Sequence, residues 1–258
     1  MWSSIVRPRW TGAGIVFLGG LLGLGWLGLR RNPRGFPPPA GTPGDLGTVA
    51  VPDELPRPVA RYLRAALGDP APLLASAVLL GKGRMRLLGL WAPVRFRFTL
   101  LAGQAYRHEI DIVWWGWPVL RADERFQGGQ AMMRLPFGTV RDSPQVDSAA
   151  NLALWGESVW LPSALAADQR LQWQPGEDDA AVLVVPSPEG TDRLRFNFDR
   201  ETGLVASVEA LRYRGPRDRA KTPWCVQVSD WERFQGVLAP SRLAIRWLDQ
   251  RGPWLLLD

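Results

Sequence analysis

The chain has 258 residues, 46% of them hydrophobic and 22% charged, so it can bury a core and is not disordered as a whole. Residues 1–39 hold five of the 31 basic residues and no acidic one. The rest of the chain therefore has 26 basic and 25 acidic residues. That near balance excludes general nucleic-acid affinity. A single cysteine, Cys225, excludes an intramolecular disulfide and a multi-cysteine metal site, so we expect no metal and no cofactor.

The first segment is an uncharged run of 20 residues between Arg9 and Arg30, WTGAGIVFLGGLLGLGWLGL. As a helix it would be roughly 30 Å long, which matches the hydrocarbon core of a bilayer. Tryptophans near its ends and arginines on both flanks suit the two interfaces. The sequence therefore predicts a transmembrane anchor at 1–31. A cleaved signal peptide and a buried core helix are the alternatives, and the absence of a small-residue cleavage site counts against the first.

Residues 32–58 are dominated by proline and glycine and predict an extended linker before a folded domain at 59–258. Apolar residues at helical spacing predict an amphipathic helix over 59–67. A second helix is expected near 147–158, where Asp147 or Ser148 could cap its first turn.

Beyond residue 75 the hydrophobic period becomes that of a strand. In 94–100 and 106–114, apolar side chains alternate with charged or polar ones, as in a sheet with one apolar and one wet face. Turn motifs such as Gln235-Gly236 separate several of the runs. This pattern predicts a mainly β (α+β) domain, a curved antiparallel sheet or half-barrel with one or two covering helices. Further strands are expected at 80–90, 118–126, 131–137, 170–174, 180–185, 192–198, 204–214, 224–230 and 242–248.

The apolar side of the predicted sheet is unusually aromatic, because 11 of the 14 tryptophans follow the linker. Such residues can fill a core, but a curved sheet that carries them on its concave face can also enclose an apolar ligand. The candidate ligand-binding residues are Phe96, Phe98, Trp114, Trp117, Trp155, Glu157, Trp160, Trp224 and Trp247.

No motif names a reaction: a G-x-S-x-G elbow, a P-loop and an H-E-x-x-H pair are all absent, and we assign no catalytic residue. His108 shares a strand face with Ile110 and Ile112 and is expected to be structural, and Cys225 is expected to be a buried, inert thiol. Glu157 lies in an apolar helix, so burial would require a partner, for which an arginine is expected. Glu109 and Asp111 are expected to be solvated on the wet face, although paired carboxylates keep glycoside cleavage open.

Four runs of the sequence resemble a bacterial family of unknown function whose members often carry an N-terminal membrane segment, with similarity from about Leu55 to the C terminus. They are LALWGESVWLPSAL, RLQWQP, LRFNFDRETGLVASVEALRYR and TPWCVQVSDWERFQGVLAPSRLAIRW. The FNFDRETGLV turn is also similar to lipoprotein-carrier-like half-barrels, which hold acyl chains on a concave sheet. The resemblance implies a half-barrel and supplies no reaction and no catalytic residue.

We therefore expect a membrane-tethered domain that binds an apolar or lipid-like ligand on its concave aromatic face. The expected location is the bacterial inner membrane, with a single span and the domain on the non-cytoplasmic side, although the flanking arginines nearly balance and do not fix the orientation. Two alternatives stay open. One is a structural or assembly module that binds another protein of the cell envelope, and the other is a carboxylate-dependent hydrolase.

Overall fold

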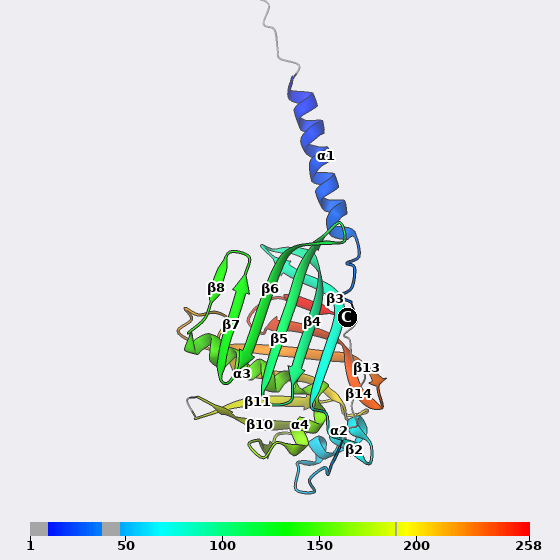
Figure 1. The fold of residues 1–258 in the computed structure, drawn as a ribbon, viewed down its shortest axis with the longest axis vertical. Helices are drawn as coiled ribbons and strands as arrows, with labels where there is room; N and C mark the ends of the chain where they lie inside the picture. Colours follow the sequence, from blue (N-terminus) through cyan, green and yellow to red (C-terminus); the bar gives the residue numbers. More distant parts are fainter. Residues whose placement is uncertain (1–9, 38–46, 189) are drawn as a thin grey trace, which may run out of the picture.

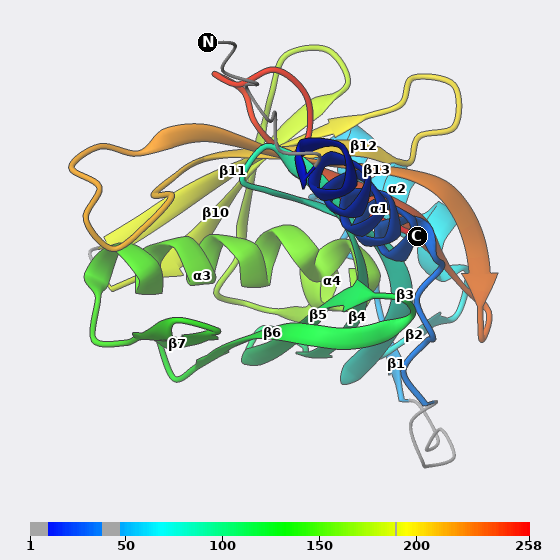
Figure 2. The same cartoon turned by 90° about the horizontal axis from the view of Figure 1, so that it is seen from above.

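The computed structural model describes residues 10–37, 47–188 and 190–258. Within them, thirteen strands form one antiparallel sheet in the order β8-β7-β6-β5-β4-β3-β15-β14-β13-β12-β11-β10-β9. The sheet bends over so that β6 and β7 face β10 and β11 across a helix (Figure 2). Its two outermost strands, β8 and β9, do not pair with each other in the described part, so the barrel is open. The predicted curved antiparallel half-barrel is confirmed.

The strands form two consecutive meanders that meet where β15 pairs with β3. Those of the first meander are β3 (Ser76–Leu87), β4 (Leu90–Leu101), β5 (Ala105–Trp114), β6 (Trp117–Gln127), β7 (Gln130–Leu135) and β8 (Gly138–Val140). Those of the second are β9 (Gln172–Pro175), β10 (Ala180–Ser187), β11 (Gly190–Phe198), β12 (Val205–Arg212), β13 (Thr222–Phe234), β14 (Val237–Trp247) and β15 (Leu255–Leu257). A separate two-stranded ladder joins β1 (Thr48–Val49) to β2 (Ala71–Pro72). Against the expectation of a strand through 80–90, β3 ends at Leu87 and residues 88–89 form a tight turn.

Four helical segments lie inside the bend: α2 (Arg57–Leu67), α3 (Pro144–Gly156), the 3₁₀ turn η1 (Glu157–Trp160) and α4 (Pro162–Ala167). The predicted helices at 59–67 and 147–158 are confirmed. Helix α3 begins with Ser143, whose hydroxyl accepts a hydrogen bond from the Val146 amide, and with Pro144 in its first turn. Every residue from 149 to 165 is buried. The chain's own helices therefore cover much of the concave face.

Helix α1 (Trp10–Arg30) projects from one end of the sheet (Figure 1) and exposes large apolar side chains such as Phe17 and Leu22. Among the described residues, no helix is long and apolar enough to cross a membrane. The helix thus forms where the sequence predicts an anchor, and the membrane span itself stays a prediction. The N-terminal basic flank of that prediction, with Arg7 and Arg9, lies outside the described residues.

The first part of the predicted linker packs on the convex face of the sheet. Arg95 donates to the Arg34 carbonyl at 3.3 Å, and Arg97 donates to the Pro37 carbonyl at 3.1 Å. The Phe36 ring lies 4.4 Å and 4.9 Å from these two guanidinium groups. This segment therefore connects α1 to the sheet by direct contacts, whereas residues 38–46 of the predicted linker lie outside the described residues.

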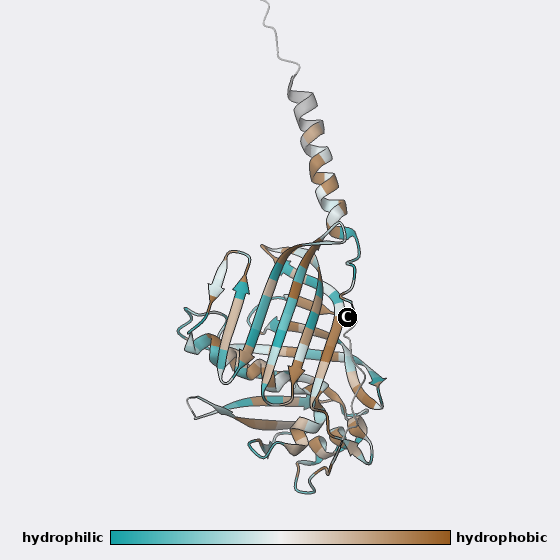
Figure 3. Ribbon diagram, in the orientation of Figure 1, coloured by the Kyte–Doolittle hydropathy of each residue, from teal (hydrophilic) through white to brown (hydrophobic). Residues whose placement is uncertain are grey.

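Hydrophilic and hydrophobic residues alternate along β4, β5 and β6 (Figure 3), with the charged side chains on the convex face. Asp111 is fully buried there, and Arg95 and Arg121 donate to it at 2.8 Å and 2.6 Å. Burial alone would raise the pKa of the Asp111 carboxyl, but these hydrogen bonds lower it. The prediction that Glu109 and Asp111 are solvated is wrong, because both are buried among arginines.

Candidate functional site

The interior holds a buried polar pair, His108 from β5 and Glu157 from η1, whose Nε2 and Oε2 atoms lie 2.7 Å apart. The imidazole lies between the Phe98 and Tyr106 rings, with centroids 4.1 Å and 4.2 Å away. Burial lowers the pKa of His108, but the Glu157 carboxylate outweighs burial and raises it above the ordinary value. The prediction of an arginine partner for Glu157 is wrong, because the partner is His108 on strand β5.

A second, half-buried carboxylate extends this cluster. The Tyr106 hydroxyl donates to Glu124 Oε1 at 2.5 Å, and Glu124 is the cross-strand neighbour of His108 on β6. Burial and the charge of Glu124 together raise the pKa of Tyr106. His108 and Glu157 line neither of the two cavities of the described structure. The pair therefore has a packing role, because it holds η1 against β5.

The structure does not gather the predicted ligand-binding residues into one site. Five aromatic members are buried at less than 10% exposure in the core: Phe96, Phe98, Trp155, Trp160 and Trp224. The Phe96 and Phe98 rings contact each other, and Trp160 Nε1 donates to the Pro240 carbonyl at 2.9 Å. Trp247 is half-buried beneath the Arg214 guanidinium. Trp114 and Trp117 are exposed beside α1, at the end of the sheet.

The larger cavity, which we call the α3 cleft, has a volume of about 540 Å³ and opens at the end of the sheet opposite α1. Asn151, Leu154 and Trp155 reach it from one face of α3, because residues three and four apart share a helix face. The β4–β5 and β6–β7 turns supply most of the opposite wall, and residues 186–188 close one side. Its volume lies within the roughly 300–1,000 Å³ typical of ligand sites.

Arg170 is the charged residue among those that line the α3 cleft. Its guanidinium donates to Asp168 and, at 2.7 Å, to the Gly103 carbonyl, and it lies 5.3 Å from the centre of the Trp155 ring. Hydrogen bonds from Arg170 lower the pKa of the Asp168 carboxyl, so the pair stays ionised and mutually neutralised. The cleft wall therefore carries no net charge from this residue.

Sequence reasoning found only Trp155 among the residues of the α3 cleft. The spacing of Asn151, Leu154 and Trp155 was the available signal, since it places a polar and two apolar side chains on one helical face. Arg170 and the turn residues carried no comparable signal, because only the folded sheet brings them to the same end.

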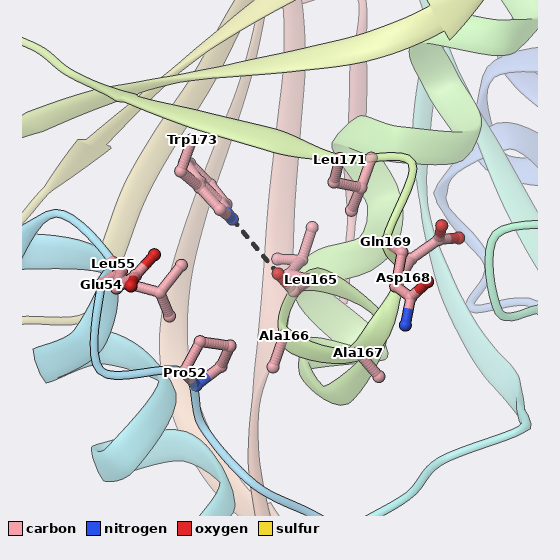
Figure 4. Close-up of a pocket in the computed structure, with 10 residues that line it drawn as sticks. All are labelled: Pro52, Glu54, Leu55, Leu165, Ala166, Ala167, Asp168, Gln169, Leu171 and Trp173. Atoms are coloured by element: carbon pink, nitrogen blue, oxygen red, sulfur yellow. Dashed lines mark hydrogen bonds between the residues drawn. The ribbon is translucent and has the colours of Figure 1, made fainter.

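A smaller cavity of about 290 Å³ lies between residues 52–55, α4 and the start of β9 (Figure 4). Leu55, Leu165 and Leu171 line it, and Trp173 Nε1 donates to the Leu165 carbonyl at 3.2 Å. Within the described part of the chain, no group of three or more histidine, cysteine, aspartate or glutamate side chains could hold a metal ion.

Residues 48–258 match the model of a family of unknown function, DUF6544. The chain belongs to this family. That membership confirms the predicted resemblance to a family of unknown function, and the match begins beyond α1. No curated protein matches the sequence of the chain.

Three solved structures are similar to the chain. A LolA superfamily protein from Nitrosomonas europaea has 11% identity over 78% of this chain and 89% of its own, with a TM-score of 0.46. An outer membrane lipoprotein-sorting protein domain from Vibrio parahaemolyticus has 10% identity over 78% and 86%, with a TM-score of 0.42. A DUF1329 family protein from Desulfovibrio piger has 11% identity over 71% and 83%, with a TM-score of 0.41.

Proposed function

We propose that this protein binds an apolar, lipid-like ligand in the α3 cleft while α1 tethers it to the bacterial inner membrane, with the domain on the non-cytoplasmic side. The observation that carries the proposal is the cleft itself, a cavity of about 540 Å³ beside Trp155. Because helices fill much of the concave face, the ligand lies at the open end of the sheet and not along the buried core residues.

The lining of the cleft favours a hydrocarbon chain. Leu101, Phe126 and Leu154 present apolar side chains, and the charge of Arg170 is already neutralised by Asp168. Burial of each methylene contributes roughly 0.8 kcal/mol, so about ten methylenes offset much of the cost of association. An anionic ligand would have to compete with Asp168 for Arg170, so a neutral or weakly polar portion of a lipid fits this wall better.

The exposed apolar surface of α1 supports the tether. The apolar side chains of Phe17, Leu21, Leu22 and Leu24 project away from the domain and are at least half exposed. A bilayer would bury these apolar side chains without removing any of their atoms from a hydrogen bond with water.

The experiment is native mass spectrometry of the full chain in detergent, with the bound lipid identified after extraction. The variants Ala105→Trp, which fills the α3 cleft, and Leu101→Glu, which places a charge in its wall, are expected to lose a lipid that the parent retains. Leu73→Glu is the matched control, because Leu73 has the same 42% exposure as Leu101 and lines neither cavity. Lipid retained by all three variants, or absent from the parent, contradicts ligand binding in the cleft.

The two alternatives find less support. A carboxylate-dependent hydrolase needs two acids that converge in an accessible cleft, whereas Glu157 is buried against His108. An assembly module for an envelope protein would need an apolar surface free for that protein. The exposed apolar surface at the α1 end adjoins α1 itself, which favours a lipid surface there over a protein partner.

A further inference from the structure

The hairpin turns at the two ends of the first meander differ sharply in chemistry. Because neighbouring strands are antiparallel, the β3–β4, β5–β6 and β7–β8 turns share one end of the sheet, and the β4–β5 and β6–β7 turns share the other (Figure 1). The second pair of turns reads Ala-Gly-Gln and Gly-Gly. The first three turns carry leucine, tryptophan and phenylalanine, and α1 leaves the domain beside them.

We call these three turns with their flanking residues, 87–91, 114–119 and 135–138, the rim. Leu88 is 97% exposed and Phe137 is 93% exposed, although both are large apolar residues. The other strongly exposed apolar residues of the rim are Leu87, Leu90, Trp114, Trp117, Val119 and Leu135. Scattered single apolar residues on a surface are normal, but a cluster of this size at one end marks an interaction surface.

Two of the rim turns place a large apolar residue in a backbone conformation that is unfavourable for it. Leu88 has φ 49° and Trp115 has φ 53°, each followed by a glycine with positive φ. Two-residue turns of this kind favour asparagine, aspartate or glycine at the first position, because bulky side chains fit poorly in the left-handed region. The β6–β7 turn, at the other end, places Gly128 and Gly129 there instead. The rim thus retains large apolar residues against local backbone preference.

Exposed arginines lie next to the rim. Arg84, Arg86 and Arg134 pair with no acidic side chain among the described residues, whereas Arg121 donates to Asp111 and Arg141 lies 3.7 Å from Asp142. Such a collar suits the phosphate groups of a membrane surface. Tryptophan and leucine beside arginine also match the composition of protein segments at a bilayer interface, where indole rings lie at headgroup level.

Helix α1 is fixed to this same surface. The Trp115 amide donates to the Gly28 carbonyl at 2.9 Å, and Trp114 Nε1 donates to the Gly25 carbonyl at 3.2 Å. Arg31 and Arg34 lie over the Trp115 and Trp117 rings, at 5.3 Å and 4.7 Å from their centres. Because α1 is held against the rim, insertion of α1 into a bilayer would place the rim at the membrane surface.

We propose that the rim is a membrane-contact surface: the tips of the three hairpins insert into the headgroup region of the bilayer, and the neighbouring arginines bind lipid phosphates. This inference rests on the membrane tether of the proposed function, but it requires no ligand in the α3 cleft. It also sets the orientation of the domain. Strand β4 has 12 residues and spans roughly 40 Å, so the cleft opens about that far from the membrane surface.

The test uses the full chain in vesicles of phosphatidylethanolamine and phosphatidylglycerol, with an environment-sensitive NBD fluorophore on single cysteines. Leu88→Cys and Phe137→Cys report on the rim. Ser76→Cys reports on the other end of the sheet, because Ser76 is exposed at the start of β3 and lines neither cavity, and Phe234→Cys is a matched control, an exposed apolar residue at the β13–β14 turn. Cys225 is fully buried, and burial raises the pKa of its thiol, so it stays unlabelled.

Labels at 88 and 137 are expected to shift their emission to shorter wavelength and to lose intensity when the vesicles contain lipids with a nitroxide near the headgroup. Labels at 76 and 234 are expected to show neither change. Equal responses at all four positions, or no response at 88 and 137, overturn the proposal. An emission shift at 88 and 137 without loss of intensity to nitroxide lipids also overturns the proposal, since it would show a rim covered by protein. Lipid retention in the α3 cleft is measured separately, so failure of either proposal leaves the other standing.

Discussion

The imidazole of His108 and the carboxylate of Glu157 meet at 2.7 Å inside the bend of the sheet, and this contact joins β5 to the segment between α3 and α4. Removal of one member of a buried pair leaves the other without a partner, which typically costs about 3–5 kcal/mol. We therefore expect Glu157→Ala to lower the free energy of unfolding by that amount, measured by urea unfolding of the full chain in detergent.

The matched variant is Glu157→Gln, which keeps a hydrogen-bonding side chain of the same size at His108. Its loss of unfolding free energy is expected to be smaller, about 1–2 kcal/mol, since a neutral hydrogen bond replaces a charge-assisted one. Equal losses for the two variants would show that the charge of Glu157 alone stabilises η1, and that neither its volume nor a neutral hydrogen bond to His108 contributes.

The same pair predicts a pH dependence. The pKa of His108 is raised in the folded protein, so its charged form stabilises the fold at pH values below the unfolded value of about 6.5. This contribution disappears as the pH rises through the raised pKa. The unfolding free energy of the parent minus that of His108→Gln is thus expected to be larger near pH 6 than near pH 9. A difference that does not change with pH would show that the pKa of His108 is the same in the folded and the unfolded protein.

Two buried tryptophans on neighbouring turns differ in one hydrogen bond. Trp160 Nε1 donates to the Pro240 carbonyl, whereas Trp155 Nε1 has no partner among the described residues. Both substitutions to phenylalanine remove similar volume. We expect Trp160→Phe to destabilise the fold by about 1 kcal/mol more than Trp155→Phe, because only the first leaves a buried carbonyl unpaired. Thermal unfolding of the two variants at one pH measures this difference.

The sequence predicts the fold better than the site because periodicity is a local property. Alternation along 94–100 and 106–114 identifies β4 and β5, and helical spacing identifies α2. The turn at Leu88-Gly89 escaped prediction, because a leucine in the left-handed region does not look like a turn residue. The strand β15, three residues long, was also missed because it is shorter than any reliable alternation.

The candidate site depends on contacts that no local pattern contains. His108 and Glu157 are 49 positions apart, and only the docking of η1 on the sheet shows that they pair. Similarly, the aromatic residues of a curved sheet look the same in sequence whether they line a hollow or pack against helices. The burial of residues 149–165 decides between these cases for the core, and it leaves the open end of the sheet for the cleft.

The strained turn at the rim predicts a gain in stability. Leu88 has φ 49° and is almost fully exposed, so asparagine can replace it without loss of packing. Because asparagine tolerates the left-handed region better, Leu88→Asn is expected to raise the free energy of unfolding by about 1 kcal/mol. The control is Leu90→Asn, in strand β4, which removes a similar exposed side chain with no positive φ to relieve and is expected to give no gain. Urea unfolding compares the two variants.

The docking of α1 on the β5–β6 hairpin depends on Gly28. A Cβ atom at this position would collide with the Trp114 and Trp115 side chains, whereas one at Gly23 would meet nothing within 4 Å. Gly28→Leu is therefore expected to detach α1 and to expose the adjoining Arg34-Gly35 bond, whose carbonyl accepts from Arg95 in the parent. Limited trypsin digestion of the full chain in vesicles measures this as faster cleavage. Gly23→Leu should be cut at the parental rate, and equal rates for both variants would show that α1 is not held by this contact.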